Sequence, residues 1–198
     1  MLLHKLIVLM SDLEHLTSRA YRIPHRSQLI RDYLRIRVKA SLNRWFHFRE
    51  EHFVGFTVDL LNYDIFLAEF RQIFVRNTYY FEPKSATPRI IDGGGNMGMS
   101  VLYFSWLAPE ASITVFEPSR EVLEVLRKNI ERNHLKHVEI VHAGLTEQDG
   151  ELTMYPRGAA ACGNTLQASI SATTSAQKQS AELPYQVKTV RLSPYLSS

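Results

Sequence analysis

The chain has 198 residues, a hydrophobic content of 45% and a formal net charge of +3. These values predict one globular domain with an extension. The apolar run from Leu6 to Met10 is followed by Asp12 and Glu14, so it is too short and too acidic for a signal peptide or a transmembrane segment. The single cysteine, Cys162, excludes an internal disulfide and fits a reducing compartment, so we expect a cytoplasmic protein.

Residues 1–80 predict a helical N-terminal extension. Ten Lys and Arg residues against five Asp and Glu residues fall in positions 1–55, so the positive charge lies here. Residues 27–48 predict a helix with Ile30, Leu34 and Val38 on one apolar stripe, and residues 66–75 predict another. A solvated basic helix face explains the charge best, and we expect no nucleic-acid partner. The eight histidines are scattered, so no metal site is predicted.

A glycine-rich segment follows a short β-rich run. Residues 89–100 read RIIDGGGNMGMS, and residues 101–107 continue as a helix-compatible sequence. This order predicts a strand, a tight turn and a helix, in which the first backbone N–H groups of the helix are free to bind a ligand. We interpret the turn as the cradle of a nucleotide-type cofactor.

Two cofactors fit this turn. Gly93, Gly95 and Gly98 match the dinucleotide pattern G-x-G-x-x-G. Asp92, Gly94, Asn96 and Gly98 match D-x-G-x-N-x-G, which resembles motif I of methyltransferases that use S-adenosylmethionine (SAM). A carboxylate at the strand end repels a pyrophosphate and suits the ammonium and sulfonium of SAM, so SAM is the favoured cofactor.

The next two units repeat the strand–helix pattern. Residues 112–116 predict a strand that ends at Glu117, whose carboxylate suits the two hydroxyls of a ribose in either cofactor. Residues 121–133 predict an amphipathic helix and residues 138–141 a third strand. Gly144 and Leu145 follow the carboxyl end of that strand, where an adenine would lie if they are more than an ordinary turn. Residues 151–155 and 185–192 predict two further strands, joined by a long loop over 157–182.

Together these motifs resemble the FkbM-type family of SAM-dependent methyltransferases. The resemblance covers about residues 74–198 and rests on an ordered series: Tyr80-Phe81, the glycine segment, Phe116-Glu117-Pro118, Asn129, Asn133 with Leu135, and residues 190–193, VRLS. The family usually has alanine where Gly95 stands. The resemblance implies a Rossmann-like α/β fold over residues 81–198, with Asp92, Gly93, Gly94, Asn96, Gly98, Glu117, Gly144 and Leu145 at the cofactor.

The resemblance also implies O-methyl transfer to a small molecule or a glycan, with no residue assigned as the catalytic base. Members of the family usually continue into a fourth strand that resembles K-I-D-x-E-G. We therefore expect a shortened domain with an incomplete sheet, an exposed edge at Ile90 and Ile91, and self-association through that edge. The alternatives are a non-catalytic SAM-binding remnant and, third, a dinucleotide-dependent oxidoreductase.

Overall fold

The computed structural model describes residues 2–18, 23–154 and 184–196. The predicted loop over 157–182, with Cys162, lies outside these residues. The N-terminal elements are α1 (Leu2–Thr17), α2 (Arg26–Phe46), β1 (Glu50–Phe53), β2 (Phe56–Asp59), α3 (Tyr63–Phe70) and the π-helical turn η1 (Arg71–Val75). The second part contains β3 (Arg89–Gly93), α4 (Met99–Leu107), β4 (Ser112–Phe116), α5 (Arg120–Arg132), β5 (Val138–Val141), β6 (Gly144–Thr146), β7 (Gly150–Met154), β8 (Tyr185–Arg191) and α6 (Ser193–Leu196).

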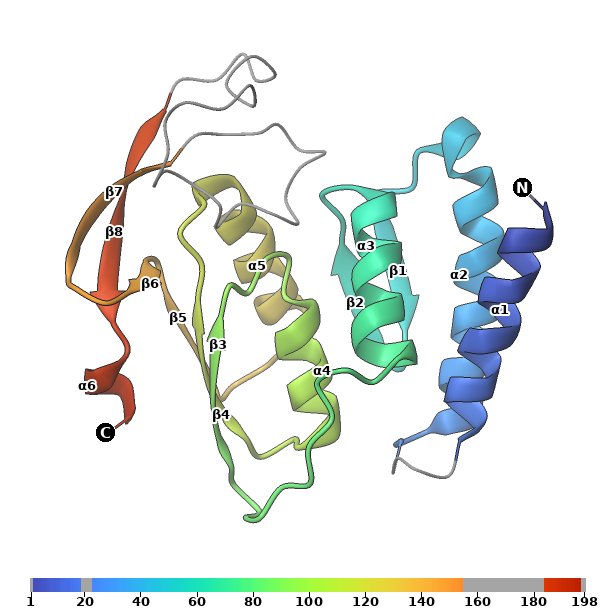
Figure 1. Cartoon of the computed structure of the whole chain (residues 1–198), viewed down its shortest axis with the longest axis horizontal. Coiled ribbons are helices and arrows are strands. Elements are labelled where there is room, and N and C mark those ends of the chain that lie inside the picture. Colours follow the sequence, from blue (N-terminus) through green and yellow to red (C-terminus); the bar gives the residue numbers. More distant parts are fainter. Residues whose placement is uncertain (1, 19–22, 155–183, 197–198) are drawn as a thin grey trace.

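The second part is built on a parallel sheet in the order β3-β4-β5 (Figure 1). One face of the sheet packs against α4 and α5, where Ile113 and Val115 meet Leu126 in a closed apolar cluster. Alternate residues of a strand point to opposite faces, so Phe116 lies on the other face. This strand–helix–strand–helix–strand order with a parallel sheet is the predicted Rossmann-like arrangement, which is confirmed.

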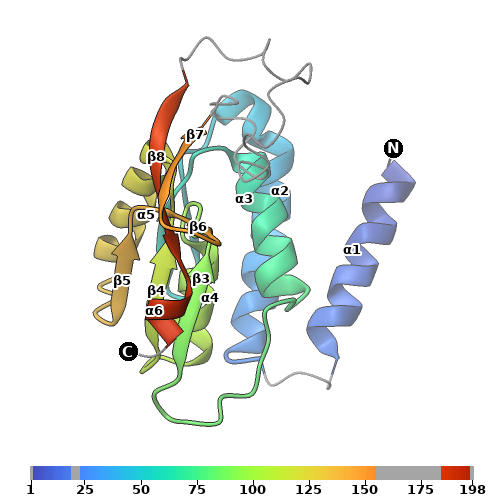
Figure 2. The ribbon, with the colours of Figure 1, turned by 60° about the vertical axis from the view of Figure 1, so that its left-hand side comes forward.

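The opposite face of the parallel sheet is covered by the C-terminal elements. Strand β8 pairs in parallel with β6 and antiparallel with β7, which forms a second sheet of three strands (Figure 2). The ring of Tyr195 in α6 packs edge-on against Phe116 at 4.8 Å between centroids. The guanidinium of Arg89 donates to the Tyr195 carbonyl at 3.0 Å. Among the described residues β3 pairs only with β4, so its other edge has no neighbouring strand, and self-association there stays a prediction.

The N-terminal extension is helical only in part, which corrects the sequence-based expectation. Its strands β1 and β2 form an antiparallel hairpin with the turn at Val54 and Gly55, which have φ angles of 43° and 92°. Positive φ at both turn positions matches the twist of a two-residue hairpin, although valine rarely adopts it. Asp32 of α2 holds this turn, because its Oδ2 accepts the Val54 N–H at 2.8 Å.

Helix α2 is confirmed, but its buried face differs from the predicted stripe. Leu29, Tyr33 and Ile36 are fully buried. Of the predicted stripe, Ile30 is partly buried against the same core, whereas Leu34 and Val38 are 41% and 60% exposed. Both sets have helical spacing, so periodicity alone does not tell which one packs inward. The buried set joins an aromatic core of the extension, which includes Phe53, Phe66, Phe70 and Phe74.

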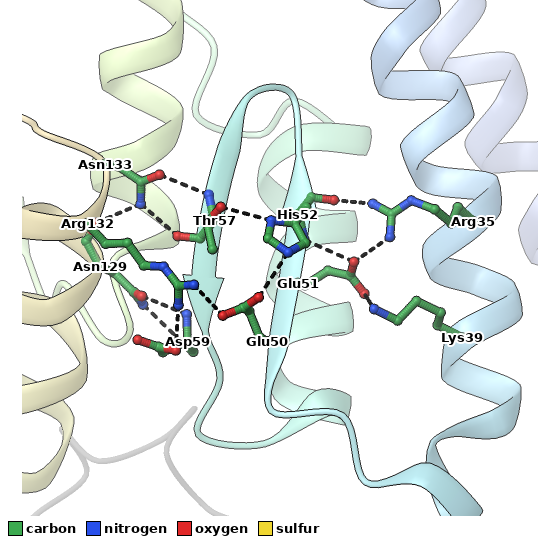
Figure 3. A network of polar contacts seen from close by, with 10 residues as sticks. All are labelled: Arg35, Lys39, Glu50, Glu51, His52, Thr57, Asp59, Asn129, Arg132 and Asn133. Carbon is green, nitrogen blue, oxygen red and sulfur yellow. Dashed lines mark hydrogen bonds and ion pairs between the residues drawn. The ribbon is translucent and has the colours of Figure 1, made fainter.

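Asn129 of α5 and Asn133, the C-cap residue of that helix, attach the hairpin to the second part of the chain (Figure 3). The amide of Asn129 accepts the Asp59 N–H at 2.8 Å and donates to the Asp59 carbonyl at 3.1 Å. Asn133 does the same with Thr57, at 2.9 and 2.8 Å. Each amide therefore occupies the N–H and C=O of one β2 residue, as a neighbouring strand would. Asn129 also donates to the carbonyl of Met97 in the glycine loop at 2.8 Å.

Replacing Asn129 by alanine is expected to lower the free energy of unfolding by about 2–3 kcal/mol, because three backbone groups, two of them partly buried and one buried, lose the amide of the fully buried Asn129. Urea unfolding measures the loss. Lys128→Ala, an exposed neighbour on the same helix, is the control and should stay within about 0.5 kcal/mol of the wild type. Equal stabilities of the two variants would contradict the docking role of Asn129.

Candidate cofactor site

The glycine loop is fixed to the ends of two neighbouring parallel strands. Asp92 lies at the end of β3 opposite Val115, and Glu117 follows directly after β4. The N–H groups of Gly94 and Gly95 both donate to the carbonyl of Phe116, at 2.9 and 3.0 Å. The loop therefore turns across the carboxyl ends of β3 and β4. Ligands of α/β proteins bind at this end of the sheet.

The backbone of the loop requires glycine at two positions for different reasons. Gly94 has a φ of 120°, a conformation that residues with a side chain rarely adopt. Gly95 has an ordinary φ, but a Cβ placed on it would lie 2.3 Å from Cγ2 of Val115. A side chain at Gly95 would therefore overlap the core, so the alanine that the family usually carries does not fit here without movement of Val115.

Glu117 lies beside the glycine loop and accepts a hydrogen bond from its backbone. Its side chain is buried, and its two oxygens accept the N–H groups of Asn96 at 2.9 Å and Ser119 at 2.8 Å. Burial raises the pKa of Glu117, and the charge of Asp92 adds to this, while the two N–H donors oppose it. Each carboxylate oxygen has a second lone pair, so the group can still accept a bond from a ligand.

Asp92 near the end of β3 is held by the first turn of α4. The Ser100 hydroxyl donates to its Oδ2 at 2.5 Å. Burial raises the pKa of Asp92, and this hydrogen bond only partly offsets the effect. A partly buried carboxyl group with a raised pKa beside a glycine loop is a frequent mark of a functional site.

A third carboxyl group, which sequence reasoning missed, reaches the loop from α3. The side-chain amide of Asn96 donates to Oε1 of Glu69. The other oxygen, Oε2, is enclosed and accepts no hydrogen bond from the described residues, and the same holds for Oδ1 of Asn96. The available sequence signal was weak: Glu69 is an acid within a largely apolar helix, Tyr63–Phe70.

The three acids have no cationic partner among the described residues. None of the ion pairs formed by the described residues includes Glu69, Asp92 or Glu117. The charges that act on Glu69 are those of Asp92 and Glu117. In the described part of the chain no group of three or more His, Cys, Asp or Glu side chains is arranged to hold a metal ion. The arrangement suits an organic cation with N–H donors.

The remaining predicted residues border the loop. Gly98 is the N-cap of α4, and its N–H donates to the Gly95 carbonyl at 2.7 Å. A Cβ placed on Gly93 would lie 3.1 Å from Cδ1 of Leu145, and one placed on Gly144 would lie 3.8 Å from Cβ of Pro118. Leu145 thus lies beside Gly93 at the end of β3, and Gly144 lies beside Pro118 after β4, while their contact with an adenine stays a prediction.

Comparison with known proteins supports a likeness to methyltransferases over part of the chain. Methyltransferase 1 of Beauveria bassiana (strain ARSEF 2860) is 32% identical over 89 residues, which cover 44% of this chain and 36% of that protein. Methyltransferase sdnD of Sordaria araneosa is 31% identical over 86 residues, which cover 43% of this chain and 33% of that protein. The chain thus spans about a third of the length of these curated relatives. No family model matches the chain.

Two solved structures have a partial likeness. TYW2 of P. horikoshii, in complex with MeSAdo, has a TM-score of 0.34 at 13% identity, over 48% of this chain and 35% of that one. Methyltransferase FkbM of Methylobacillus flagellatus KT has a TM-score of 0.31 at 16% identity, over 43% and 29%. These TM-scores are too low to assign a function, and the FkbM-type family is not confirmed by them.

Proposed function

We propose that this chain is the cofactor-binding part of an FkbM-type methyltransferase that uses SAM. The observation that carries the proposal is the pair of acids at the ends of β3 and β4, Asp92 and Glu117, around a glycine loop and without a cationic partner among the described residues. SAM has an ammonium and a sulfonium and no phosphate, so its charge complements this site. A dinucleotide would bring its pyrophosphate against these carboxyl groups.

The proposed contacts follow from the chemistry of each residue. Glu117 accepts hydrogen bonds from the ribose hydroxyls, through the lone pairs that Asn96 and Ser119 leave free. Asp92 contributes negative charge near the methionine part of the cofactor. The backbone of Gly93, Gly94 and Gly98 permits close approach, and Gly144 and Leu145 border the adenine.

The proposed reaction is transfer of a methyl group to a hydroxyl oxygen of a small molecule or a glycan. Bound SAM supplies an activated methyl group, and the residues of this chain bind and orient the cofactor. Because the chain matches only about a third of the length of each of these two curated relatives, the acceptor and the whole protein's activity belong to the proposal. Among the described residues no helix is both long and apolar enough to cross a membrane.

Isothermal titration with SAM, S-adenosylhomocysteine and NAD tests the choice of cofactor. We expect binding of the two adenosyl amino acids and much weaker binding of NAD, because only NAD brings phosphate charge to the acids. Asp92→Asn should reduce the preference for SAM over NAD, whereas Glu110→Gln, an exposed acid, should leave it unchanged. Tighter binding of NAD than of SAM by the wild-type chain would overturn the proposal.

A further inference from the structure

The N-terminal extension places a carboxyl group of its own at the glycine loop. Glu69 lies in the last turn of α3, and its Oε1 accepts the side-chain amide of Asn96. The backbone N–H of the same Asn96 donates to Glu117 at 2.9 Å. Asn96 therefore lies between two acids, one from the extension and one from the end of β4.

One oxygen of Glu69 lacks a hydrogen-bond donor among the described residues. Oε2 is shielded from solvent and accepts no hydrogen bond from the described residues. An enclosed carboxyl oxygen without a donor is costly, and a positively charged N–H group satisfies it best. None of the ion pairs of the described residues supplies such a group to Glu69.

The groups that face Glu69 make its surroundings negative. They are Asp92 from β3 and Glu117 after β4. The Tyr79 hydroxyl, from the segment after η1, also interacts with Glu69 and Asp92. The pKa of Tyr79 is raised by burial and by the charges of Asp92 and Glu69, so this phenol stays neutral at ordinary pH. Burial, with the charges of Asp92 and Glu117, raises the pKa of Glu69 to about 7, although the bond from Asn96 opposes this.

We propose that Glu69 binds the α-ammonium group of SAM, so that the N-terminal extension completes the cofactor site. This inference rests on the proposed function. The ammonium offers three N–H donors, whereas the sulfonium has none, so an oxygen that lacks a donor selects the ammonium. Glu117 is already assigned to the ribose, and both of its oxygens hold backbone N–H groups, whereas Oε2 of Glu69 is free.

A pair of ligands separates the ammonium from the rest of the cofactor. S-adenosylhomocysteine and 5′-methylthioadenosine both contain adenosine and a neutral sulfur, and only S-adenosylhomocysteine carries the α-amino acid, so the sulfonium charge does not enter their comparison. Glu69→Gln is expected to weaken the binding of SAM and of S-adenosylhomocysteine alike, at least about tenfold, the range for hydrogen bonds to a charged group, and to leave 5′-methylthioadenosine binding unchanged. Asp64→Asn removes an exposed acid from the same helix and is the matched control, with these affinities unchanged.

The pH dependence of binding gives a second readout. An ammonium bound to Glu69 lowers the pKa of that carboxyl from about 7, so complex formation releases a proton at pH values near and below 7. SAM affinity should therefore rise from about pH 5.5 to 7.0, which lies below the range of about 7.7–8.0 where a free α-amino group titrates. Titration at pH 6.5 in buffers of different ionisation enthalpy counts the released protons. Glu69→Gln should release fewer, and Glu69→Asp, which keeps the charge, should retain the release.

The outcomes separate this inference from the proposed function. If the wild-type chain binds neither SAM nor 5′-methylthioadenosine, both fall. If it binds SAM but Glu69→Gln leaves the affinity and the proton release unchanged, only the role of Glu69 is overturned. Equal losses of SAM and 5′-methylthioadenosine binding in Glu69→Gln would also overturn it, because they would show that Glu69 supports the loop and does not bind the ammonium.

Discussion

Replacing Gly94 by valine is expected to abolish SAM binding, with a loss of affinity beyond about a hundredfold. Gly94 has a φ of 120°, and its N–H donates to the Phe116 carbonyl at 2.9 Å. A β-branched residue cannot adopt this φ without severe strain, so the loop must leave the position in which it crosses the ends of β3 and β4. Isothermal titration with SAM measures the loss.

The hairpin turn provides a matched control for Gly94. Gly55 also has a positive φ, 92°, and a Cβ placed on it would meet no atom within 4 Å. Gly55→Val therefore adds the same kind of backbone strain in the extension, away from the glycine loop. It should lower the melting temperature and reduce SAM affinity far less than Gly94→Val does, because the hairpin contacts the loop only through Asn129. If Gly94→Val bound SAM as the wild type does, the loop would not be the cofactor cradle.

Replacing Asp12 by alanine is expected to lower the free energy of unfolding by about 3–5 kcal/mol, the range for breaking a buried ion pair. Asp12 is the fully buried acid of α1, and its oxygens accept bonds from Arg71 at 2.7 Å, Arg76 at 2.8 Å and the Tyr33 hydroxyl at 2.5 Å. The alanine variant would leave two guanidinium groups and a phenol without their acceptor. Urea unfolding at pH 7 measures the loss, and Glu14→Ala, an exposed acid of α1, should cost less than about 0.5 kcal/mol.

The loss at Asp12 also depends on pH. Burial acts to raise the pKa of Asp12, but the bonds from Arg71, Tyr33 and Arg76 outweigh it, so the pKa lies below its ordinary value of 3.8. A carboxyl with a lowered pKa in the folded state stabilises the fold above its unfolded pKa, and this contribution disappears as the pH falls through the folded value. The stability difference between wild type and Asp12→Ala should be constant above about pH 5 and should shrink in acid. A difference that stays the same in acid would show that Asp12 acts by packing alone.

The parallel sheet could be predicted well from the sequence, because each of its strands and helices is marked by a short, continuous pattern of residues. The segments from β3 to β5 alternate in strict order, and right-handed crossovers leave such a chain few ways to fold. The closeness of Asp92 and Glu117 followed from the same rule, since both stand at carboxyl ends of neighbouring strands. Their roles toward a cofactor stay predictions.

Other features depended on tertiary contacts that no short pattern reports. Glu69 meets the glycine loop only because α3 packs beside it, 27 residues away in the chain from Asn96. The hairpin was missed because its turn is Val54-Gly55, without the Asn-Gly or Asp-Gly pair that usually marks such a turn. In α2, Leu34 and Val38 had the spacing of a buried face, yet the contacts of Tyr33 decided which side packs inward.

The side chain of Asn129 has a consequence for local motion. One amide contacts both the Met97 carbonyl of the glycine loop and the two backbone groups of Asp59 in the hairpin. The loop cannot open fully without breaking its hydrogen bond to Asn129. Fraying of β2 breaks the bonds between Asp59 and the same amide, which then holds the Met97 carbonyl less firmly. We therefore expect these two segments to open together in local unfolding, although they lie in different parts of the chain. A ligand that orders the loop would also slow the opening of the hairpin. Binding at the cofactor site would therefore change the dynamics of the N-terminal extension.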